Sequence, residues 1–540
     1  MENTAPLARK EIQATLHKRV LDFTQGYRQN VALIGEELMG KTTLLRDLLQ
    51  QMSDPDIVPV YVEIVPYEFG LFVKRLLNSL LYHYLKSSQL ISSRESLEVM
   101  LERARAAIPQ SAQLFTDILA GLEREKEDRL FKELLGAFDY FLHETQKKCV
   151  LVIDEFHHLQ KLNSKNIWEE LSKKIMFQKN CHVILASSAR HEARGILTNE
   201  LSLLFGNFET LELHMLCAAE SATLVASRLE GLKVPAPIID FCIHFTGGHP
   251  FYLKVIADEI GFVCRAQSKD TCEREDVIEA LERLMFYEWG LFNLKFATHL
   301  SLLTTGRNRN ELIYLLDAIA TGKNRLRDLA GYLRRPKKEI TQKLNRLTEL
   351  DMLAKNGSFY LIQDRLMSFW LRFVHAEKLY SLTPDHREQA QHFRAHCAEE
   401  LDRFLESSRK DVAQRVLELF NRFENDEILW ERKRVPLCAF KELRILRFDE
   451  NEACVGIFGK AQDSLWLAAV KNGGIEERDV ALLLKEAQKH GGLTVRKIMI
   501  GLGPIERNAR LLAKESRVLT WDIAHINNLL DLFGQPRIIS

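Results

Sequence analysis

The sequence predicts an α/β protein whose first domain is a parallel sheet covered by helices. Residues 31–34 read VALI and run directly into a glycine loop and a helical stretch, TTLLRDLLQQM. Two further apolar runs, CVLVI at 149–153 and HVILA at 182–186, are short and rich in β-branched residues. Continuous apolar runs of this length are typical of strands buried on both faces of a parallel sheet.

The loop after the first strand fits the P-loop spacing G-x-x-x-x-G-K-[ST]. Two glycines free the backbone so that successive N–H groups can surround phosphate oxygens, the lysine adds a positive charge, and the threonine offers a hydroxyl to Mg²⁺. We therefore expect ATP and Mg²⁺ to bind here, with nucleotide contacts from Gly35, Glu36, Glu37, Leu38, Met39, Gly40, Lys41, Thr42 and Thr43.

The run CVLVI ends in Asp154 and Glu155. The carboxyl ends of parallel strands meet at one edge of a sheet, so Asp154 should lie beside Thr42 and help to hold Mg²⁺. Glu155 is then placed to polarise an attacking water. His157 and His158 follow on the same turn, and neighbouring side chains do not face each other on a helix, so we expect them to have surface or packing roles.

The strand at 182–186 leads into Ser187, Ser188 and Arg190. These residues would lie at the strand tip and act as sensors of the γ-phosphate, although ordinary capping of the strand end explains them as well. Other predicted elements are an amphipathic helix over 8–30, a strand over 58–64 and a helical insertion over 70–147 that packs on the sheet.

A second segment, TGGHPFYL at 246–253, has a proline in the first turn of a predicted helix, which by itself indicates only a helix start. Taken in order, the P-loop, VLVIDEF, ASS and TGGHPFYL resemble the archaeal-type ATPase family, a branch of the STAND class of signal-transducing P-loop ATPases. The resemblance implies that His249 and Pro250 lie against the adenine or ribose and report on nucleotide state. Family P-loops usually carry small or basic residues where this chain has Glu36 and Glu37, and two carboxylates repel a polyphosphate unless they point outward or share Mg²⁺. We expect weaker nucleotide affinity as a result.

The same resemblance continues over residues 308–374, which match the winged-helix region of the family. Its signature reads YLIQDRLMSFW here, with Arg365 where proline is usual. The residues alone predict helices over 311–320, 324–333 and 337–350, then a hairpin that turns at Asn356-Gly357.

Positive charge is concentrated in this predicted winged helix. Nine Lys or Arg stand against two acids between Lys323 and Arg346, a local charge of +7 in a chain whose formal net charge is zero. Such a cluster favours double-stranded DNA, although a solvated face used only for protein contacts is the alternative. The predicted DNA contacts are Arg334, Arg335, Lys337, Lys338, Lys343 and Arg346.

After a polar linker over 381–391, the pattern changes again. Helices are predicted over 393–425, 477–490 and 504–515, strands over 443–448, 453–459, 464–470 and 497–503, and the chain closes with WDIAHINNLLDLFG. This order resembles the restriction-endonuclease-like fold, PD-(D/E)xK, which often follows the winged helix in archaeal-type ATPases.

Cleavage by that fold needs an acid on one strand and Glu-x-Lys on the next, because two carboxylates bind the metal and the lysine steadies the water. Here the second motif reads Ala469-Val470-Lys471, and Val455-Gly456-Ile457 stands where the acid is expected. We predict a degenerate domain that no longer cuts. A metal site in another register would draw on Glu399, Glu400, Asp449 or Asp463.

The predicted organisation is a P-loop ATPase domain over 1–210, a helical lid over 211–288, a winged helix over 289–380 and the nuclease-like domain over 381–540. Composition is that of a globular protein, with 46% apolar and 27% charged residues, and its nine cysteines form no C-x-x-C pair. This disfavours a zinc ribbon or a disulfide framework. No apolar leader and no run of 18 apolar residues occurs, so we expect a cytoplasmic protein without membrane contact.

The leading functional hypothesis is a slow ATPase that switches between states and passes the change to DNA, a protein partner or a second copy of itself. The alternatives are a DNA-binding regulator or initiator-like protein with a structural nucleotide, and an active ATP-dependent nuclease.

Overall fold

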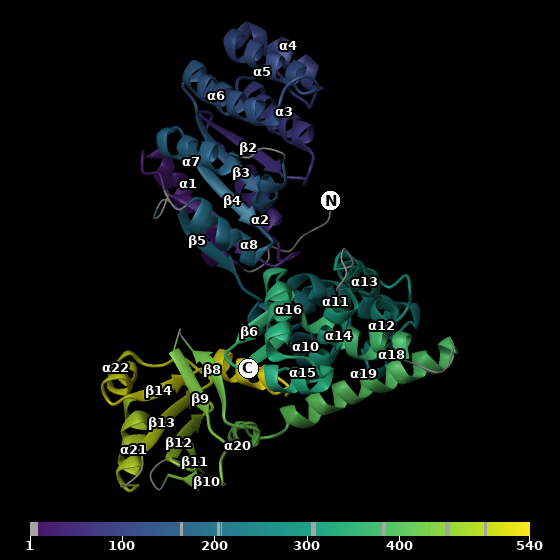
Figure 1. The fold of residues 1–540 in the computed structure, drawn as a ribbon, viewed down its shortest axis with the longest axis vertical. Coiled ribbons are helices and arrows are strands. Elements are labelled where there is room, and N and C mark those ends of the chain that lie inside the picture. The colour runs from purple at the N-terminus through teal and green to yellow at the C-terminus, as the bar shows by residue number, and fades with distance from the viewer. Residues whose placement is uncertain are drawn as a thin grey trace. The chain divides into compact units, whose positions relative to one another are not determined.

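The computed structural model describes residues 9–162, 166–201, 206, 208–303, 309–380, 385–430, 433–448, 454–490 and 494–539. The chain divides into two compact units, Met1–Met215 and Leu216–Ser540 (Figure 1). Within the described residues, no helix combines the length and apolar character needed to span a bilayer. Asp449 and the first four residues of the predicted linker, 381–384, lie outside the described residues.

The first unit contains a five-stranded parallel sheet in the order β2-β3-β4-β1-β5. The strands are β1 (Asn30–Gly35), β2 (Ile57–Glu63), β3 (Lys148–Asp154), β4 (Cys181–Ser187) and β5 (Phe208–Leu213). This confirms the parallel α/β sheet predicted for the beginning of the chain. Because β4 lies between β1 and β3, its tip separates the end of the P-loop strand from the end of the acidic strand.

Helices cover both faces of this sheet. On one face, α1 (Lys10–Thr24) and α2 (Lys41–Gln50) share an apolar cluster with Val31, Val150 and Val152. The other face carries the predicted helical insertion, which is α3 (Phe69–Ser87), α4 (Leu97–Ala107), α5 (Pro109–Gly121) and α6 (Glu127–Thr145), followed by α7 (Ile167–Phe177). Short helices η1 (Phe156–Lys161), α8 (Arg190–Gly195) and η2 (Ile196–Glu200) complete the unit.

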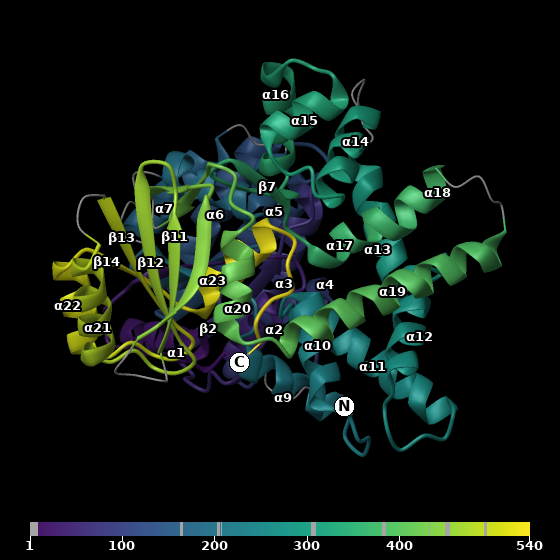
Figure 2. The ribbon, with the colours of Figure 1, turned by 90° about the horizontal axis from the view of Figure 1, so that it is seen from below.

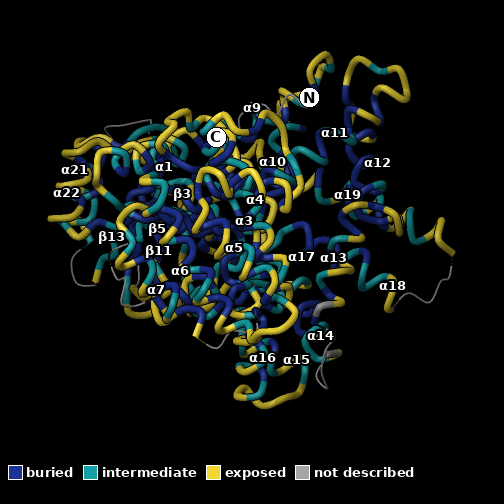
Figure 3. Tube along the Cα trace, turned by 90° about the horizontal axis from the view of Figure 1, so that it is seen from above, coloured by how far each residue is buried: buried dark blue, intermediate teal, exposed yellow. Residues whose placement is uncertain are grey.

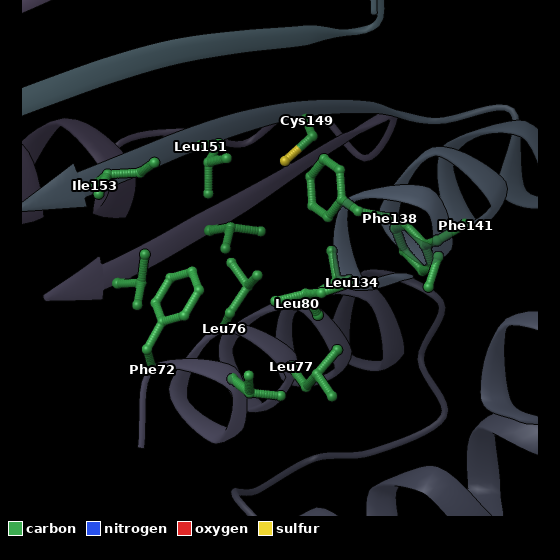
Figure 4. Close-up of a cluster of buried hydrophobic side chains, with 14 of the residues drawn as sticks. Phe72, Leu76, Leu77, Leu80, Leu134, Phe138, Phe141, Cys149, Leu151 and Ile153 are labelled. Carbon is green, nitrogen blue, oxygen red and sulfur yellow. The ribbon is translucent and has the colours of Figure 1, made fainter. Parts of the chain in front are cut away.

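The alternation of side chains along β3 explains how one apolar strand serves two cores. Leu151 and Ile153 point to the cluster under α3 and α6, where Leu76, Leu80 and Phe138 meet them (Figure 4). Successive residues of a strand face opposite sides, so Val150 and Val152 reach the other cluster. The predicted packing of the insertion against the sheet is therefore confirmed.

The second unit begins with a series of helices that leads into a short hairpin. The helices are α9 (Ala218–Arg228), α10 (Ala236–Thr246), α11 (Pro250–Ala266), α12 (Arg274–Met285) and α13 (Leu291–Leu302), then α14 (Arg309–Ala320), α15 (Leu326–Leu333) and α16 (Lys337–Glu349). A two-stranded hairpin follows, β6 (Leu353–Asn356) and β7 (Phe359–Ile362), and then α17 (Arg365–Trp370), η4 (Leu371–His375) and α18 (Ala376–Tyr380).

The hairpin turns one residue later than the sequence predicts. Asn356 pairs with Phe359, so the two loop residues are Gly357 and Ser358. Of these two, Gly357 has a positive φ of 59°, the pattern of a type II′ turn with glycine at its first central position. The Asn-Gly signal therefore located the hairpin but not its register.

The C-terminal part contains a five-stranded sheet in the order β10-β11-β12-β13-β14, with β10, β11 and β12 antiparallel and β12, β13 and β14 parallel. Its strands are β10 (Glu442–Arg447), β11 (Cys454–Lys460), β12 (Ser464–Lys471), β13 (Thr494–Gly501) and β14 (Val518–Trp521). One face is covered by α20 (Val412–Phe420) and α23 (Ile523–Leu532), the other by α21 (Glu477–Gln488) and α22 (Arg507–Glu515) (Figure 2).

Two features of this part differ from the prediction. Helix α19 (His386–Ser408) begins inside the stretch expected to be linker, because Phe393, Cys397, Leu401 and Phe404 form a buried stripe on an otherwise polar helix. A second hairpin, β8 (Asp426–Trp430) and β9 (Lys433–Leu437), was not predicted.

Candidate functional site

The site at the end of β1 is shaped by a loop with unusual backbone angles. Leu38 has φ of 61° and Gly40 has φ of 91°, so two residues of the loop are left-handed. Such turns orient backbone N–H groups toward a common centre. Gly40 is also the N-cap of α2 and makes no side-chain cap, so the first N–H groups of the helix face the loop.

Gly35 is required for a different reason. A Cβ at this position would lie 2.8 Å from the Cβ of Leu213 on β5. The first glycine of the motif thus permits close packing of two strands, and the second permits the left-handed turn.

Lys41 folds back over the loop. Its Nζ donates to the carbonyl oxygens of Gly35 at 2.9 Å and Glu36 at 2.8 Å, and the side chain is 4% exposed. Burial lowers the pKa of this lysine, although the nearby carboxylates, with Glu155 and Asp154 foremost, oppose that effect. The ammonium is held at the loop and surrounded by negative charge.

Thr42 and Asp154 meet directly. The Thr42 hydroxyl donates to Oδ2 of Asp154 at 2.7 Å, and Asp154 is 1% exposed. The second carboxylate oxygen, Oδ1, accepts the N–H of Glu155 at 3.0 Å. The structure therefore brings together the loop and the acid pair, which lie 112 residues apart in the sequence.

Glu155 is held by Ser188. Its Oε2 accepts both the N–H of Ser188 at 2.9 Å and the Ser188 hydroxyl at 2.8 Å. Glu155 itself has a positive φ of 52°, which turns its side chain toward the tip of β4. Of the predicted sensor residues, Ser188 is thus the one that contacts the candidate catalytic glutamate.

Ser187 faces the other way, toward a buried histidine. Its Oγ lies 2.9 Å from Nδ1 of His157, and the same nitrogen is 3.4 Å from Oε2 of Glu155. Burial, together with nearby positive groups, lowers the pKa of His157 to about 3, so the ring is neutral. His157 therefore belongs to the site, whereas the sequence suggested only a surface or packing role.

Arg190 forms an ion pair with Glu36, with 3.0 Å between Nη2 and Oε1. This pair offsets one of the two loop carboxylates that the sequence flagged as repulsive to a polyphosphate. Among the remaining loop residues, Met39 is buried and Thr43 is exposed on α2.

A residue that the sequence did not indicate completes the acid end of the site. The hydroxyl of Tyr61, on β2, donates to Oδ2 of Asp154 at 2.8 Å. Burial and the neighbouring Asp154 raise the pKa of Tyr61, so this hydroxyl keeps its proton. In the sequence Tyr61 reads as one apolar position in VPVYVEI, and no local signal marks it as part of a site.

The segment TGGHPFYL lies in the second unit and forms the turn between α10 and α11. Gly248 has φ of 83°, and a Cβ there would lie 2.4 Å from the carbonyl oxygen of Leu216. Pro250 opens α11, and the buried His249 ring lies 4.3 Å from that of Tyr252. The contact of His249 and Pro250 with nucleotide remains a prediction.

A buried charge cluster joins this turn to the end of the chain. Asp531 of α23 pairs with Arg365 and, at 2.6 Å, with Arg537. Arg537 also donates to the carbonyl oxygen of Gly247 at 3.2 Å, and its N–H lies 3.2 Å from Nδ1 of His244. Arg365, the departure from the family signature, thus ties α17 to α23 inside the second unit.

The basic segment is exposed where α15 turns into α16. Arg334, Arg335, Lys337 and Lys338 are all exposed there, and the surface remains exposed along α16 (Figure 3). Three other cations of the segment are ion-paired: Arg325 with Asp426 at 2.9 Å, Arg327 with Glu424 at 2.8 Å, and Lys343 with Glu339 at 2.6 Å. Arg346 lies 3.4 Å from Glu349.

The tip of the β6–β7 hairpin is covered by β8. The N–H of Ser358 donates to the carbonyl oxygen of Glu427 at 2.8 Å, and the N–H of Leu429 donates to Asn356 at 2.7 Å. A Cβ on Gly357 would lie 2.0 Å from that same Glu427 oxygen. The tip of the β6–β7 hairpin is therefore packed against β8 inside the second unit.

Lys471, at the end of β12, is bound by an acid that the sequence did not suggest. Its Nζ lies 2.7 Å from Oδ2 of Asp479, which is fully buried. Lys471 also lines a cavity of about 390 Å³, together with Asp411. Of the predicted substitute ligands, Glu400 lies against His244 and Arg403, and Glu399 against His396.

Comparison with known proteins supports the assignment of the first unit. Residues 24–197 match the family described as an AAA domain. No curated protein matches the chain. The residues so matched include the P-loop, the acid pair and the tip of β4, so the chain contains an AAA-type P-loop ATPase domain.

Several solved structures are distantly similar. A Walker-type ATPase of Pyrococcus abyssi is 16% identical, with a TM-score of 0.47, over 68% of this chain and 97% of that one. The ORC2 protein of Aeropyrum pernix, in ADPNP–ADP complexes, is 13% identical, with a TM-score of 0.43, over 73% and 94%. The RuvB Holliday junction branch migration motor of Thermotoga maritima is 14% identical, with a TM-score of 0.34, over 68% and 95%.

Proposed function

We propose that this protein is a cytoplasmic, slowly hydrolysing ATPase that acts as a nucleotide-dependent switch. The observation that carries the proposal is the 2.7 Å hydrogen bond between Thr42 and Asp154. It joins a loop suited to phosphates with a carboxylate suited to a metal, at one edge of the sheet.

The residues present fit Mg²⁺ as well as ATP. Thr42 and Asp154 offer oxygen atoms alone, which is the donor set that a hard cation prefers. When bound, Mg²⁺ would neutralise charge on the β- and γ-phosphates and orient them. The chain's own donors to phosphate oxygens would be the N–H groups of the loop, the N-terminus of α2 and the Lys41 ammonium, which here donates to the carbonyl oxygens of Gly35 and Glu36.

Glu155 is the residue we assign to polarise the attacking water. Both hydrogen bonds from Ser188 reach Oε2, so the carboxylate is fixed at the tip of β4. The two hydrogen bonds hold the carboxylate in one orientation. Because the same oxygen already accepts both of them, it attracts a proton of the attacking water less strongly, which supports slow hydrolysis of ATP to ADP and phosphate.

The test is nucleotide binding by the Lys41→Ala variant, measured by calorimetry with ATP and Mg²⁺. The variant should lose detectable binding because the ammonium at the loop is removed. Lys173→Ala is the matched control, since Lys173 is exposed on α7 and pairs only with neighbouring Glu169 and Glu170 among the contacts seen. Equal affinity of Lys41→Ala and wild type would refute the proposal.

We further propose that the second unit comprises a lid over 211–288, a winged helix over 289–380 and a degenerate restriction-endonuclease-like domain over 381–540. Three helices followed by a hairpin support the second assignment. The order of the C-terminal sheet, with one antiparallel strand next to its edge, supports the third. A protein partner or a second copy of the chain would receive the response through this unit.

Double-stranded DNA is the partner that the exposed turn favours. Arg334 and Arg335 lie exposed in the turn between α15 and α16, and Lys338 in the first turn of α16, where a recognition helix would approach phosphates. Neutralising these three residues should weaken binding in a gel-shift assay and reduce the slope of log affinity against log salt by roughly 2.7, at about 0.9 per phosphate contact.

The control for that assay removes the same charge elsewhere in the unit. Arg507, Arg510 and Lys514 are exposed on α22, and their neutralisation should leave the salt slope unchanged. If both triple variants lose affinity equally, the DNA contact does not lie at α16. If neither variant nor wild type binds DNA, the exposed turn serves a protein contact instead.

Nuclease activity is not part of the proposal. The Lys471 ammonium is taken by Asp479, and Ala469 and Gly456 stand opposite each other on β12 and β11 where carboxylates would be needed. A plasmid-cleavage assay with Mg²⁺ or Mn²⁺ should give no product.

A further inference from the structure

Tyr61 has an unusual position for a residue of an edge strand. It lies on β2, at the outer edge of the sheet, in register with Val152 of β3. Its hydroxyl nevertheless reaches Oδ2 of Asp154, two residues further along β3, at 2.8 Å. The same oxygen accepts the Thr42 hydroxyl at 2.7 Å. One carboxylate oxygen therefore accepts from two hydroxyl groups, one on β2 and the other in the first turn of α2.

The tyrosine is fixed by groups on both sides of the chain. Its N–H, which faces away from β3, donates to Oγ of Ser79 on α3 at 3.0 Å. The guanidinium of Arg46, on the helix that follows the P-loop, lies 5.4 Å from the centre of its ring. These contacts leave the ring little freedom, so the hydroxyl is aimed at Asp154 before any ligand arrives.

We propose that Tyr61 is a positioning residue that holds the Asp154 carboxylate in the orientation needed for the metal. This inference rests on the proposed function. Thr42 is itself an expected metal ligand, so its bond to Asp154 does not secure the carboxylate in the loaded site. Tyr61 makes no other hydroxyl contact in the described part of the chain and donates to Asp154 alone.

A ring-packing role is the competing explanation for Tyr61. It would require only an aromatic side chain, so phenylalanine would serve as well. A positioning role requires the hydroxyl. Removing a partner that orients a metal-binding side chain typically lowers metal affinity 10- to 100-fold, and this range is the effect expected here.

The experiment compares Tyr61→Phe with wild type in a titration of MgCl₂ against a fluorescent ATP analogue at fixed concentration. The half-saturating Mg²⁺ concentration should rise about 10- to 100-fold in the variant. Affinity for the analogue in EDTA should stay unchanged, because the phosphate contacts of the loop are intact. Binding of Mn²⁺ in the presence of nucleotide, followed by electron paramagnetic resonance, should show the same loss.

Tyr82→Phe is the matched control. Tyr82 is a partly buried tyrosine on α3 whose ring contacts that of His83 edge to face. Removal of its hydroxyl should not change the Mg²⁺ titration. The unfolding midpoint of Tyr61→Phe should lie close to that of wild type, which separates positioning from a general loss of structure.

Two outcomes would overturn the inference: an unchanged Mg²⁺ titration in Tyr61→Phe, or an equal loss of binding in EDTA. Either result leaves the proposed function intact as long as wild type binds nucleotide in a Mg²⁺-dependent manner. Failure of wild type to bind nucleotide would instead refute the proposed function itself.

Discussion

The charge cluster around Asp531 allows the sharpest test of how the second unit is held together. Asp531 lies between two guanidinium groups, those of Arg365 and Arg537, and its side chain is 14% exposed. Asp531→Asn keeps the shape but removes the carboxylate that Arg365 and Arg537 share, which leaves the two arginines facing each other. Removing one partner of a buried ion pair costs about 3–5 kcal/mol. The side chains of the two arginines are about a quarter exposed, so solvent reduces the cost of leaving them without Asp531. We therefore expect the free energy of unfolding to fall by about 2–4 kcal/mol.

Tryptophan fluorescence suits this measurement, because five of the six tryptophans lie at or beyond residue 289 and so report on the second unit. The urea midpoint of the fluorescence transition should fall in Asp531→Asn. Asp402→Asn is the control, since Asp402 pairs with Arg274 at the surface, where a salt bridge contributes about 0–1 kcal/mol. Equal midpoints for Asp531→Asn and wild type would refute the assigned contribution of the cluster.

The same cluster predicts a pH dependence. Burial opposes ionisation of Asp531, but Arg365 and Arg537 outweigh it and lower the pKa. The folded-state pKa therefore lies below the unfolded value of about 3.9. The stabilisation is fully present above that value and is lost as the pH falls through the folded-state pKa. Wild type should thus lose stability below about pH 4 more steeply than Asp531→Asn does.

Three further changes test other parts of the structure. Ser188→Ala removes the hydroxyl that holds Glu155, so kcat for ATP hydrolysis should change while nucleotide affinity in a binding assay stays constant; a parallel change in affinity would contradict this. Leu80→Ala removes a fully buried side chain beneath the sheet and should cost about 2–5 kcal/mol, seen as faster hydrogen exchange in β2 and β3 and not in the second unit. Gly248→Ala should destabilise the turn before α11, because its Cβ would lie 2.4 Å from the Leu216 carbonyl oxygen in a left-handed conformation; unchanged exchange there would count against it.

The geometry of the candidate nucleotide site was predictable where short stretches of sequence carry the signal. A loop of fixed spacing after a strand, and an acid pair at the end of a strand, each define their own backbone position. The loop and the acid pair lie close together because the carboxyl ends of parallel strands lie at the same edge of a sheet. Tyr61 carries no such signal, since its contact with Asp154 depends on the register of β2 against β3, which pairs residues 91 positions apart.

Contacts between distant segments explain the other misses. Arg365 stood out in the sequence as a departure from a family signature, but its partner Asp531 lies 166 residues later. The hairpin of β8 and β9 has strands of only five residues each, both begin with two charged residues, and β9 contains Pro436, so its pattern does not stand out from a loop. In α19 the apolar residues Phe393, Cys397, Leu401 and Phe404 recur at steps of three and four, and they lie in the helix predicted from residue 393; only the polar first turns, 386–391, have the pattern of a linker.

The structure also changes how the basic segment should be understood. A count over the sequence gives +7, but Arg325, Arg327 and Lys343 are paired with acids of the same unit. The tip of the β6–β7 hairpin is covered as well, so a DNA partner would contact the turn and α16 without it. The exposed charge that remains lies at Arg334 and Arg335, in the turn before α16, and at Lys337 and Lys338, in its first turn.

Those two lysines are in an unfavourable place for the helix. The N-terminus of a helix carries partial positive charge, so a cation there costs about 0.3–1 kcal/mol and an anion contributes about as much. Lys338→Glu should therefore raise the unfolding midpoint of the second unit slightly while it weakens DNA binding. A residue that binds phosphate at the expense of helix stability should change the unfolding midpoint and the DNA affinity in opposite directions. A variant that lost both stability and binding, or neither, would show that Lys338 has no such role.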